Sequence, residues 1–158
     1  MLVKLTVNGQ VHEVDVEPRT LLLDLLRELG YRSVHQGCDD GKCGACTVIM
    51  DGNAVKSCLI FAVQANGSEI MTAEGLATKE GPHPLQTAFH ENFAVQCGYC
   101  TPGMLMTAYD FLSKTPEVDE ATVRKNITGN LCRCTGYVNV VKAIVKAAGS
   151  RQAGRWKR

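Results

Sequence analysis

The sequence has no long hydrophobic run and no marked excess of charge of either sign. No apolar segment approaches the roughly 18 residues that a membrane-spanning helix needs, so no membrane span is predicted. The first six residues alternate in character instead of forming the apolar core of a signal peptide, and we therefore expect a cytoplasmic protein. The 17 basic and 16 acidic side chains nearly cancel, which gives no reason to expect nucleic acid or a membrane surface as a partner.

Internal repeats and low-complexity segments are absent as well, and cysteine is the residue type that stands out. Hydrophobic residues make up 45% of the 158 positions, enough for one ordinary core or two small ones. The eight cysteines are about 5% of the chain, below the roughly 8–10% that is typical of a short disulfide scaffold. In a reducing compartment, a fixed cysteine pattern indicates metal binding more often than crosslinks.

The first half of the chain is predicted to form strands around one helix. Residues 2–7 and 11–16 alternate in character around Asn8-Gly9-Gln10, which is typical of a hairpin with a tight turn. A short helix is expected up to residue 29, with Thr20 as its N-cap and Gly30 as its stop. Further strands are expected over residues 47–50, 54–57 and 69–72. Together they predict a small α+β domain over residues 1–74.

The second half is predicted to be helical. Residues 75–84 contain two glycines and two prolines and are expected to form a linker. Four helices are expected over residues 85–93, 102–112, 118–127 and 138–148. They fit a compact bundle over residues 85–149, with an apolar core that includes Phe89, Phe93, Leu105 and Phe111. Residues 150–158 are expected to be a basic, flexible tail.

Four of the cysteines lie in the first half, and their spacing is specific. The order is C-x4-C-x2-C followed by a later cysteine, which is the plant-type ferredoxin pattern for a [2Fe–2S] cluster. The candidate ligands are Cys38, Cys43, Cys46 and Cys58. Gly37, Gly41 and Gly44 would let the backbone curl tightly and bring N–H groups close to the sulfurs, where a larger residue could block the approach.

The other four cysteines lie in the helical half with a different spacing. A C-x2-C pair is followed, after 31 residues, by a C-x-C pair. The candidate ligands are Cys97, Cys100, Cys132 and Cys134. An oxidised cluster with four thiolates would carry a net charge of about −2, and glycines near the ligands and helix starts are candidates to supply the N–H donors that this charge needs.

Two other readings of the cysteines stay open from the spacing alone. Four disulfides would explain an even count, and two structural zinc ions could each accept four thiolates. The Gly-rich loop suits a cluster better than a zinc knuckle. A Rieske centre is not indicated because no C-x-H pattern occurs, and we expect the histidines to be ordinary surface or packing residues, namely His12, His35, His83 and His90.

Three motifs together resemble a known family. They are GCDDGKCGACTV at residues 37–48, QCGYCTPG at residues 96–103 and GNLCRCTGY at residues 129–137. In this order they are similar to the iron–sulfur subunit of molybdenum hydroxylases, the xanthine oxidase family. The resemblance covers residues 1 to about 149.

The resemblance implies an N-terminal β-grasp ferredoxin-like domain and a C-terminal four-helix domain, each with one [2Fe–2S] cluster. Such subunits carry electrons from a large molybdenum–pterin subunit to a medium FAD subunit in a dimer of heterotrimers. The second cysteine set would hold the cluster near molybdenum and the first set the cluster nearer FAD. Gln96 and Cys134 match positions that lie against the pterin. The chain itself would have no catalytic residue, because the substrate reacts on another chain.

Some questions stay open at this point. Members of the family act on aldehydes, N-heteroaromatics, aryl-CoA thioesters and carbon monoxide, and the discriminating residues lie on the molybdenum-bearing chain. A free two-cluster ferredoxin and a zinc-stabilised interaction module are the alternative functions. Tyr99 and Arg133 stand between ligands, where shielding of a cluster, docking of the large subunit, simple packing and a surface salt bridge are all consistent with the sequence.

Overall fold

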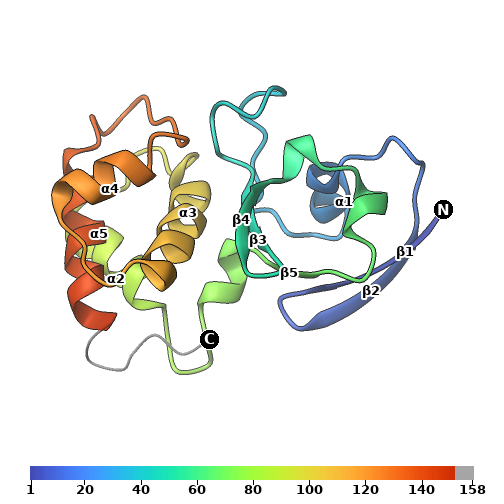
Figure 1. The fold of residues 1–158 in the computed structure, drawn as a ribbon, viewed down its shortest axis with the longest axis horizontal. Coiled ribbons are helices and arrows are strands. Elements are labelled where there is room, and N and C mark those ends of the chain that lie inside the picture. The colour runs from blue at the N-terminus through green and yellow to red at the C-terminus, as the bar shows by residue number, and fades with distance from the viewer. Residues whose placement is uncertain (152–158) are drawn as a thin grey trace.

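The computed structural model describes residues 1–151 and places a mixed sheet with one helix beside a group of four helices (Figure 1). The strands are β1 (Leu2–Val7), β2 (Gln10–Asp15), β3 (Thr47–Met50), β4 (Asn53–Lys56) and β5 (Glu69–Met71). The helices are α1 (Leu22–Glu28), α2 (Pro84–Glu91), α3 (Thr101–Lys114), α4 (Glu120–Asn126) and α5 (Val138–Arg151), with 3-10 turns η1 (Ser57–Leu59), η2 (Ala62–Ala65) and η3 (Ala73–Leu76). The predicted α+β class is confirmed. The predicted basic tail lies, from residue 152 on, outside the described residues.

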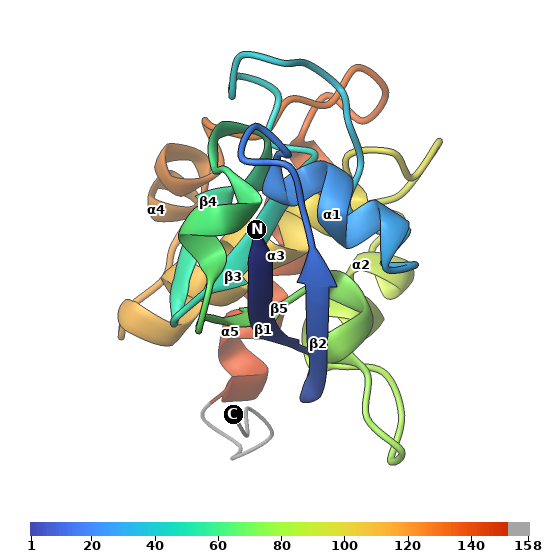
Figure 2. The ribbon, with the colours of Figure 1, turned by 90° about the vertical axis from the view of Figure 1, so that its right-hand side faces the viewer.

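The sheet has the order β2-β1-β5-β3-β4, with β1 and β5 parallel and the other neighbours antiparallel. The predicted hairpin is confirmed, and its turn residues Asn8 and Gly9 have φ angles of 50° and 80°. Two successive residues with positive φ give the turn the twist that antiparallel strands need. Figure 2 shows this hairpin, β1 and β2, on the side of the sheet away from the four helices.

Helix α1 begins differently from the prediction. Thr20 is not its N-cap, because the backbone before the helix is paired with residues 60–62. Leu22 N–H donates to the Ile60 carbonyl at 2.8 Å, and Ala62 N–H donates to the Thr20 carbonyl at 2.7 Å. A backbone carbonyl from another segment therefore satisfies the first helical N–H, and no side-chain cap is needed. Gly30 ends the helix as predicted, with a φ of 97°.

Strand β3 separates two hydrophobic cores. Successive side chains of a strand point to opposite faces, and here both faces are buried. Val48 packs in the core that α1 forms with the sheet, whereas Ile49 packs in the core of the four helices. Leu76 on η3 also lies in the helical core and is 3% exposed.

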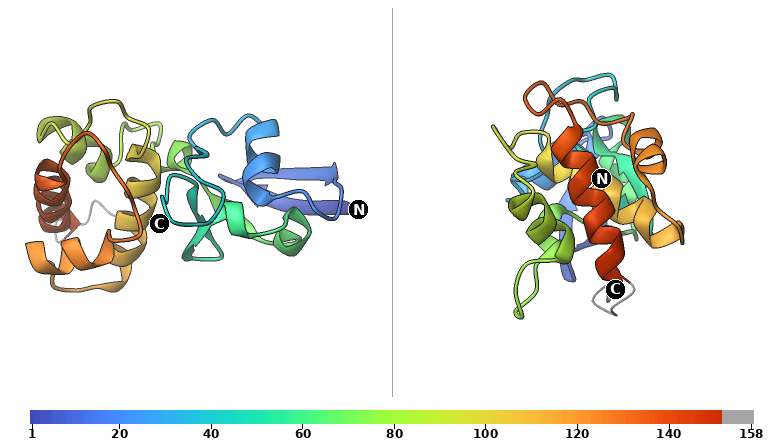
Figure 3. Two further views of the ribbon diagram at one scale, coloured as in Figure 1. Left: turned by 90° about the horizontal axis from the view of Figure 1, so that it is seen from above. Right: turned by 90° about the vertical axis from the view of Figure 1, so that its left-hand side faces the viewer.

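All four predicted helices of the second half are confirmed, with ends shifted by up to three residues. In Figure 3, α5 lies on the side of the four-helix group that faces away from the sheet. Three of the four aromatic and aliphatic residues predicted for the core are buried, but Phe93 is 80% exposed. The prediction was wrong there because α2 ends at Glu91 and the backbone turns at Phe93 with a φ of 53°, which directs the side chain outward.

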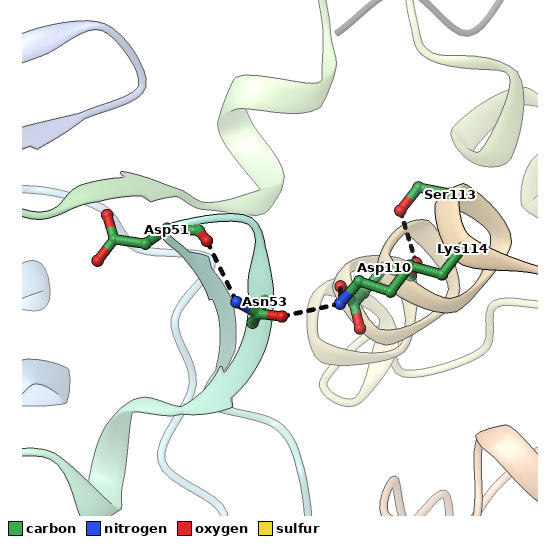
Figure 4. A network of polar contacts seen from close by, with 5 residues as sticks. All are labelled: Asp51, Asn53, Asp110, Ser113 and Lys114. Carbon is green, nitrogen blue, oxygen red and sulfur yellow. Dashed lines mark hydrogen bonds and ion pairs between the residues drawn. The ribbon is translucent and has the colours of Figure 1, made fainter.

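A polar network joins the β3–β4 turn to the C-terminal end of α3 (Figure 4). Lys114 Nζ donates to Asn53 Oδ1 at 3.0 Å and forms an ion pair with Asp110 at 2.5 Å. Asn53 Nδ2 donates to the Asp51 carbonyl at 3.2 Å. Among residues 1–151, no helix has the length and apolar character to cross a membrane.

Candidate iron–sulfur sites

The first cysteine set is assembled by the loop between α1 and β3 together with η1. The loop brings three of the cysteines together, and Cys58 is added from η1 after the β3–β4 hairpin. Two backbone groups point at sulfurs: Cys43 N–H donates to Cys38 Sγ at 3.3 Å, and Ala45 N–H donates to Cys43 Sγ at 3.5 Å. Such N–H donors stabilise the negative charge of thiolates and of a cluster that they hold.

The glycines of this loop leave no room for side chains. Gly41 and Gly44 have φ angles of 74° and 73°, which the left-handed turns of the loop require. A Cβ on Gly37 would lie 3.0 Å from Cys43 Sγ. The expected close approach to a sulfur is therefore seen at Gly37, whereas a Cβ on Gly41 would meet the Leu59 side chain and one on Gly44 would meet the Gly129 carbonyl.

The second cysteine set comes from two loops of the helical half. One loop precedes α3 and the other joins α4 to α5. Cys97 Sγ and Cys134 Sγ lie 3.5 Å apart, and both residues are exposed. Thr135 donates to Cys132 Sγ from its backbone N–H at 3.4 Å and from its hydroxyl at 3.1 Å. The two cysteines closest to solvent thus lie together on one face.

The raised pKa values of two thiols indicate that thiolates in these sets need a bound cation. Burial, followed by the neighbouring Cys46 sulfur, raises the pKa of Cys58 to about 12. Burial, followed by the neighbouring Cys132 sulfur, raises the pKa of Cys100 to about 12. Adjacent thiolates repel each other, and metal cations remove that penalty because only the thiolate binds the metal.

The arrangement of the thiols fits a two-iron cluster better than a single ion. In the second set the thiols lie in pairs, Cys97 with Cys134 and Cys100 with Cys132. A [2Fe–2S] cluster takes two thiolates on each iron, whereas zinc draws four around one centre. All eight cysteines are free thiols, as either site requires.

The two cysteine sets are joined by a seam of hydrogen bonds between their loops. Leu131 N–H donates to the Cys43 carbonyl at 2.8 Å, and Asn130 Nδ2 donates to the Gly44 carbonyl at 3.1 Å. Helix α3 also packs tightly against the first cysteine loop, since a Cβ added to Gly103 would lie only 2.1 Å from the Gly44 carbonyl oxygen. Sequence reasoning missed this seam, because no local pattern links residues more than 80 positions apart.

Tyr99 adds a second contact between the loops. Its hydroxyl donates to the Gln36 carbonyl at 2.6 Å, and its ring stacks on His35 with 4.5 Å between the centroids. His35 Nδ1 lies 2.7 Å from the Tyr99 carbonyl. Of the roles that the sequence left open for Tyr99, the structure supports packing between the loops, and His35 is the packing residue that was expected. Gln96 lies beside Cys97 and is exposed.

Comparison with known protein families agrees with this geometry. Residues 5–75 match the family described as 2Fe-2S iron-sulfur cluster binding domain, and residues 72–145 match the family described as [2Fe-2S] binding domain. The fold and its two cysteine sets therefore define a protein with two [2Fe–2S]-binding domains.

Whole-chain comparisons identify the particular family. The gamma subunit of caffeine dehydrogenase from Pseudomonas sp. (strain CBB1) is 50% identical over 147 residues, which are 90% of this chain and 88% of that protein. The quinoline 2-oxidoreductase of Pseudomonas putida 86 contains a chain with a TM-score of 0.94 and 43% identity, covering 99% of this chain and 98% of that one. The aldehyde oxidoreductase of Desulfovibrio gigas has a TM-score of 0.91 and 37% identity, covering 98% of this chain but 17% of that longer chain.

This chain belongs to the small iron–sulfur subunits of the xanthine family of molybdenum hydroxylases. It is an iron–sulfur subunit of an oxidoreductase complex. The predicted family and the predicted ferredoxin-like fold are confirmed.

Proposed function

We propose that the chain relays electrons between a molybdenum–pterin site on a large partner chain and FAD on a medium partner chain, through two [2Fe–2S] clusters. When bound, each cluster would accept and release one electron. The first cluster would be held by Cys38, Cys43, Cys46 and Cys58, and the second by Cys97, Cys100, Cys132 and Cys134. The chain itself would provide thiolate ligands, N–H donors to sulfur and solvent exclusion, which together set the reduction potentials.

The seam between the two cysteine loops carries this proposal. The Cys43 carbonyl accepts a hydrogen bond of 2.8 Å from Leu131 N–H, and Leu131 directly precedes Cys132. A single hydrogen bond thus connects the backbone of one candidate ligand with the neighbour of another. Two isolated structural metal sites would not need such a connection, whereas a relay needs its two centres close together. Both loops rise on the same side of the sheet and helices in Figure 1.

The exposure of the cysteines supports an orientation of the chain between its two partners. Cys97, Cys134 and Gln96 are exposed, whereas Cys46 and Cys58 are buried. We infer that the exposed face meets the large chain, with Gln96 and Cys134 against the pterin. The Gln96 amide can both donate and accept hydrogen bonds there. The cluster of the first set would then lie nearer FAD.

The same reasoning supports a division of the chain into two functional units. We assign residues 1–74 to the unit of the first cluster and residues 85–149 to the unit of the second, with residues 75–84 between them. The core that α1 forms with the sheet lies wholly within residues 1–74 and supports the first unit. The helical core is built mainly from residues 85–148 and also takes in Ile49, Ala73 and Leu76, so the two units share the face of β3 that meets the helices.

Serine variants of one ligand from each set test the partition. We expect Cys43→Ser to remove or alter one of two paramagnetic signals of the reduced protein, and Cys134→Ser to affect the other. Each variant should leave the signal of the intact set unchanged. Loss of both signals from either variant, with normal circular dichroism, would contradict the assignment. Co-purification from the source cell should recover a flavin-bearing chain and a larger molybdenum-bearing chain.

A further inference from the structure

The ammonium group of Lys56 lies at the seam between the two cysteine loops. Lys56 is the last residue of β4, and its Nζ donates to the Gly129 carbonyl at 2.5 Å. A Cβ on Gly44 would lie 2.7 Å from the same Nζ, so the ammonium also contacts the first cysteine loop. The residue as a whole is half-buried, and its hydrogen bond to Gly129 is exposed. One positive charge therefore lies against both loops at once.

No carboxylate compensates this charge. Other lysines form ion pairs: Lys42 with Asp40, Lys114 with Asp110, and Lys146 with Glu91. Within residues 1–151, Lys56 has no such ion pair, and its acceptor is a neutral carbonyl. The full positive charge is thus available to any negative group at the seam.

The two loops that this charge contacts carry candidate ligands of both proposed clusters. Gly44 stands between the candidate ligands Cys43 and Cys46, and Gly129 is three residues before Cys132. An oxidised cluster with four thiolates carries a net charge of about −2, and reduction adds one more negative charge. A nearby cation stabilises the more negative state more strongly, because the attraction between opposite charges grows with the charge.

We propose that Lys56 raises the reduction potentials of both clusters, and so acts as a shared electrostatic control on electron transfer between them. This inference rests on the proposed two-cluster function. A clamp that merely holds the loops together would need only the hydrogen bond to Gly129. An effect on the reduction potentials requires the positive charge itself.

Three variants of Lys56 separate charge from hydrogen bonding. Lys56→Met keeps most of the apolar stem and removes both the charge and the donor. Lys56→Gln removes the charge and keeps an N–H donor. Lys56→Arg keeps the charge. Lys4→Gln on β1 is the matched control, because it removes the same charge from an exposed site in the hairpin away from the four helices.

The measurement is a redox titration of the purified full chain with its clusters, followed by electron paramagnetic resonance. We expect both signals of Lys56→Met and Lys56→Gln to titrate at more negative potentials than in the wild type. Lys56→Arg and Lys4→Gln should titrate as the wild type does. The shape of the signals should be retained, which shows that the clusters are still assembled.

Two results would overturn the inference. One is a Lys56→Gln protein whose two potentials equal those of the wild type, which would reduce Lys56 to a clamp. The other is a shift of one potential alone, because the charge would then act on a single cluster. A wild-type protein without two distinct signals would instead refute the two-cluster function, so the failures of the two proposals are distinguishable.

Discussion

Replacement of Gly103 by alanine tests the contact between α3 and the first cysteine loop. Gly103 is the third residue of α3, and the new Cβ would lie 2.1 Å from Gly44 O and 3.0 Å from the Ala45 Cα. Both obstacles are backbone atoms, so they cannot rotate away as a side chain would. The loop and the helix would have to separate by roughly 1 Å to restore ordinary contact.

The expected magnitude follows from opposing contributions. Alanine is favoured over glycine in a helix by up to about 1 kcal/mol, and this acts in favour of the variant. Overpacking against a fixed neighbour costs about 1–3 kcal/mol, and a lost seam hydrogen bond, such as that from Asn130 to Gly44 O, costs about 1 kcal/mol. The net result is a destabilisation of about 2 kcal/mol.

The matched control is Gly149→Ala in α5. Gly149 is the third residue from the C-terminal end of α5, but a Cβ there would meet nothing within 4 Å. We expect this variant to be as stable as the wild type or slightly more stable. The assay is urea unfolding of the cluster-loaded protein, followed by far-ultraviolet circular dichroism. If Gly103→Ala proved as stable as Gly149→Ala, the close approach of α3 to the cysteine loop would be refuted.

Two further predictions concern strain and acid. Phe93→Gly should stabilise the chain by about 0.5–1 kcal/mol in the same assay. Phe93 has a φ of 53° and is 80% exposed, and glycine adopts this backbone conformation without strain. A less stable variant would show that contacts of the ring contribute more than the strain. Burial alone would raise the pKa of Glu74, but hydrogen bonds from Ser33 and Thr72 outweigh it and hold the pKa below its usual value. Because the folded pKa is depressed, the stabilisation is present above the unfolded pKa and lost as pH falls through the folded pKa. Glu74→Gln should therefore unfold at a lower urea concentration than the wild type at pH 7, and the difference between their unfolding midpoints should narrow below about pH 4.5. A difference in midpoint that stays constant across this range would contradict the reasoning.

Local patterns were enough to predict the elements and the cysteine sets. The hairpin follows from Asn8 and Gly9, whose backbone preference is a property of those two residues. The spacing of the cysteines fixes which thiols can share a loop. These features depend on neighbours in sequence, and the structure has them where the sequence indicated.

Two predictions failed where a distant residue or a turn of the backbone outweighed a local preference. Thr20 is a good capping residue, but Ile60 supplies the carbonyl that the helix start uses. Phe93 fits the helical periodicity of a core residue, but α2 ends before it and the chain turns. In each case a tertiary or backbone constraint outweighed a propensity of about 1 kcal/mol or less.

The order of the amino acids alone determined the family, the three cysteine motifs and nearly every strand and helix, because each depends on short-range spacing. Only the folded molecule decided how the two cysteine sets meet. The bonds from Leu131 to Cys43 and from Lys56 to Gly129 join segments that are far apart along the chain. Such contacts arise when separate cores pack on the two faces of β3, and no periodicity in the sequence records which backbone atoms then come within reach.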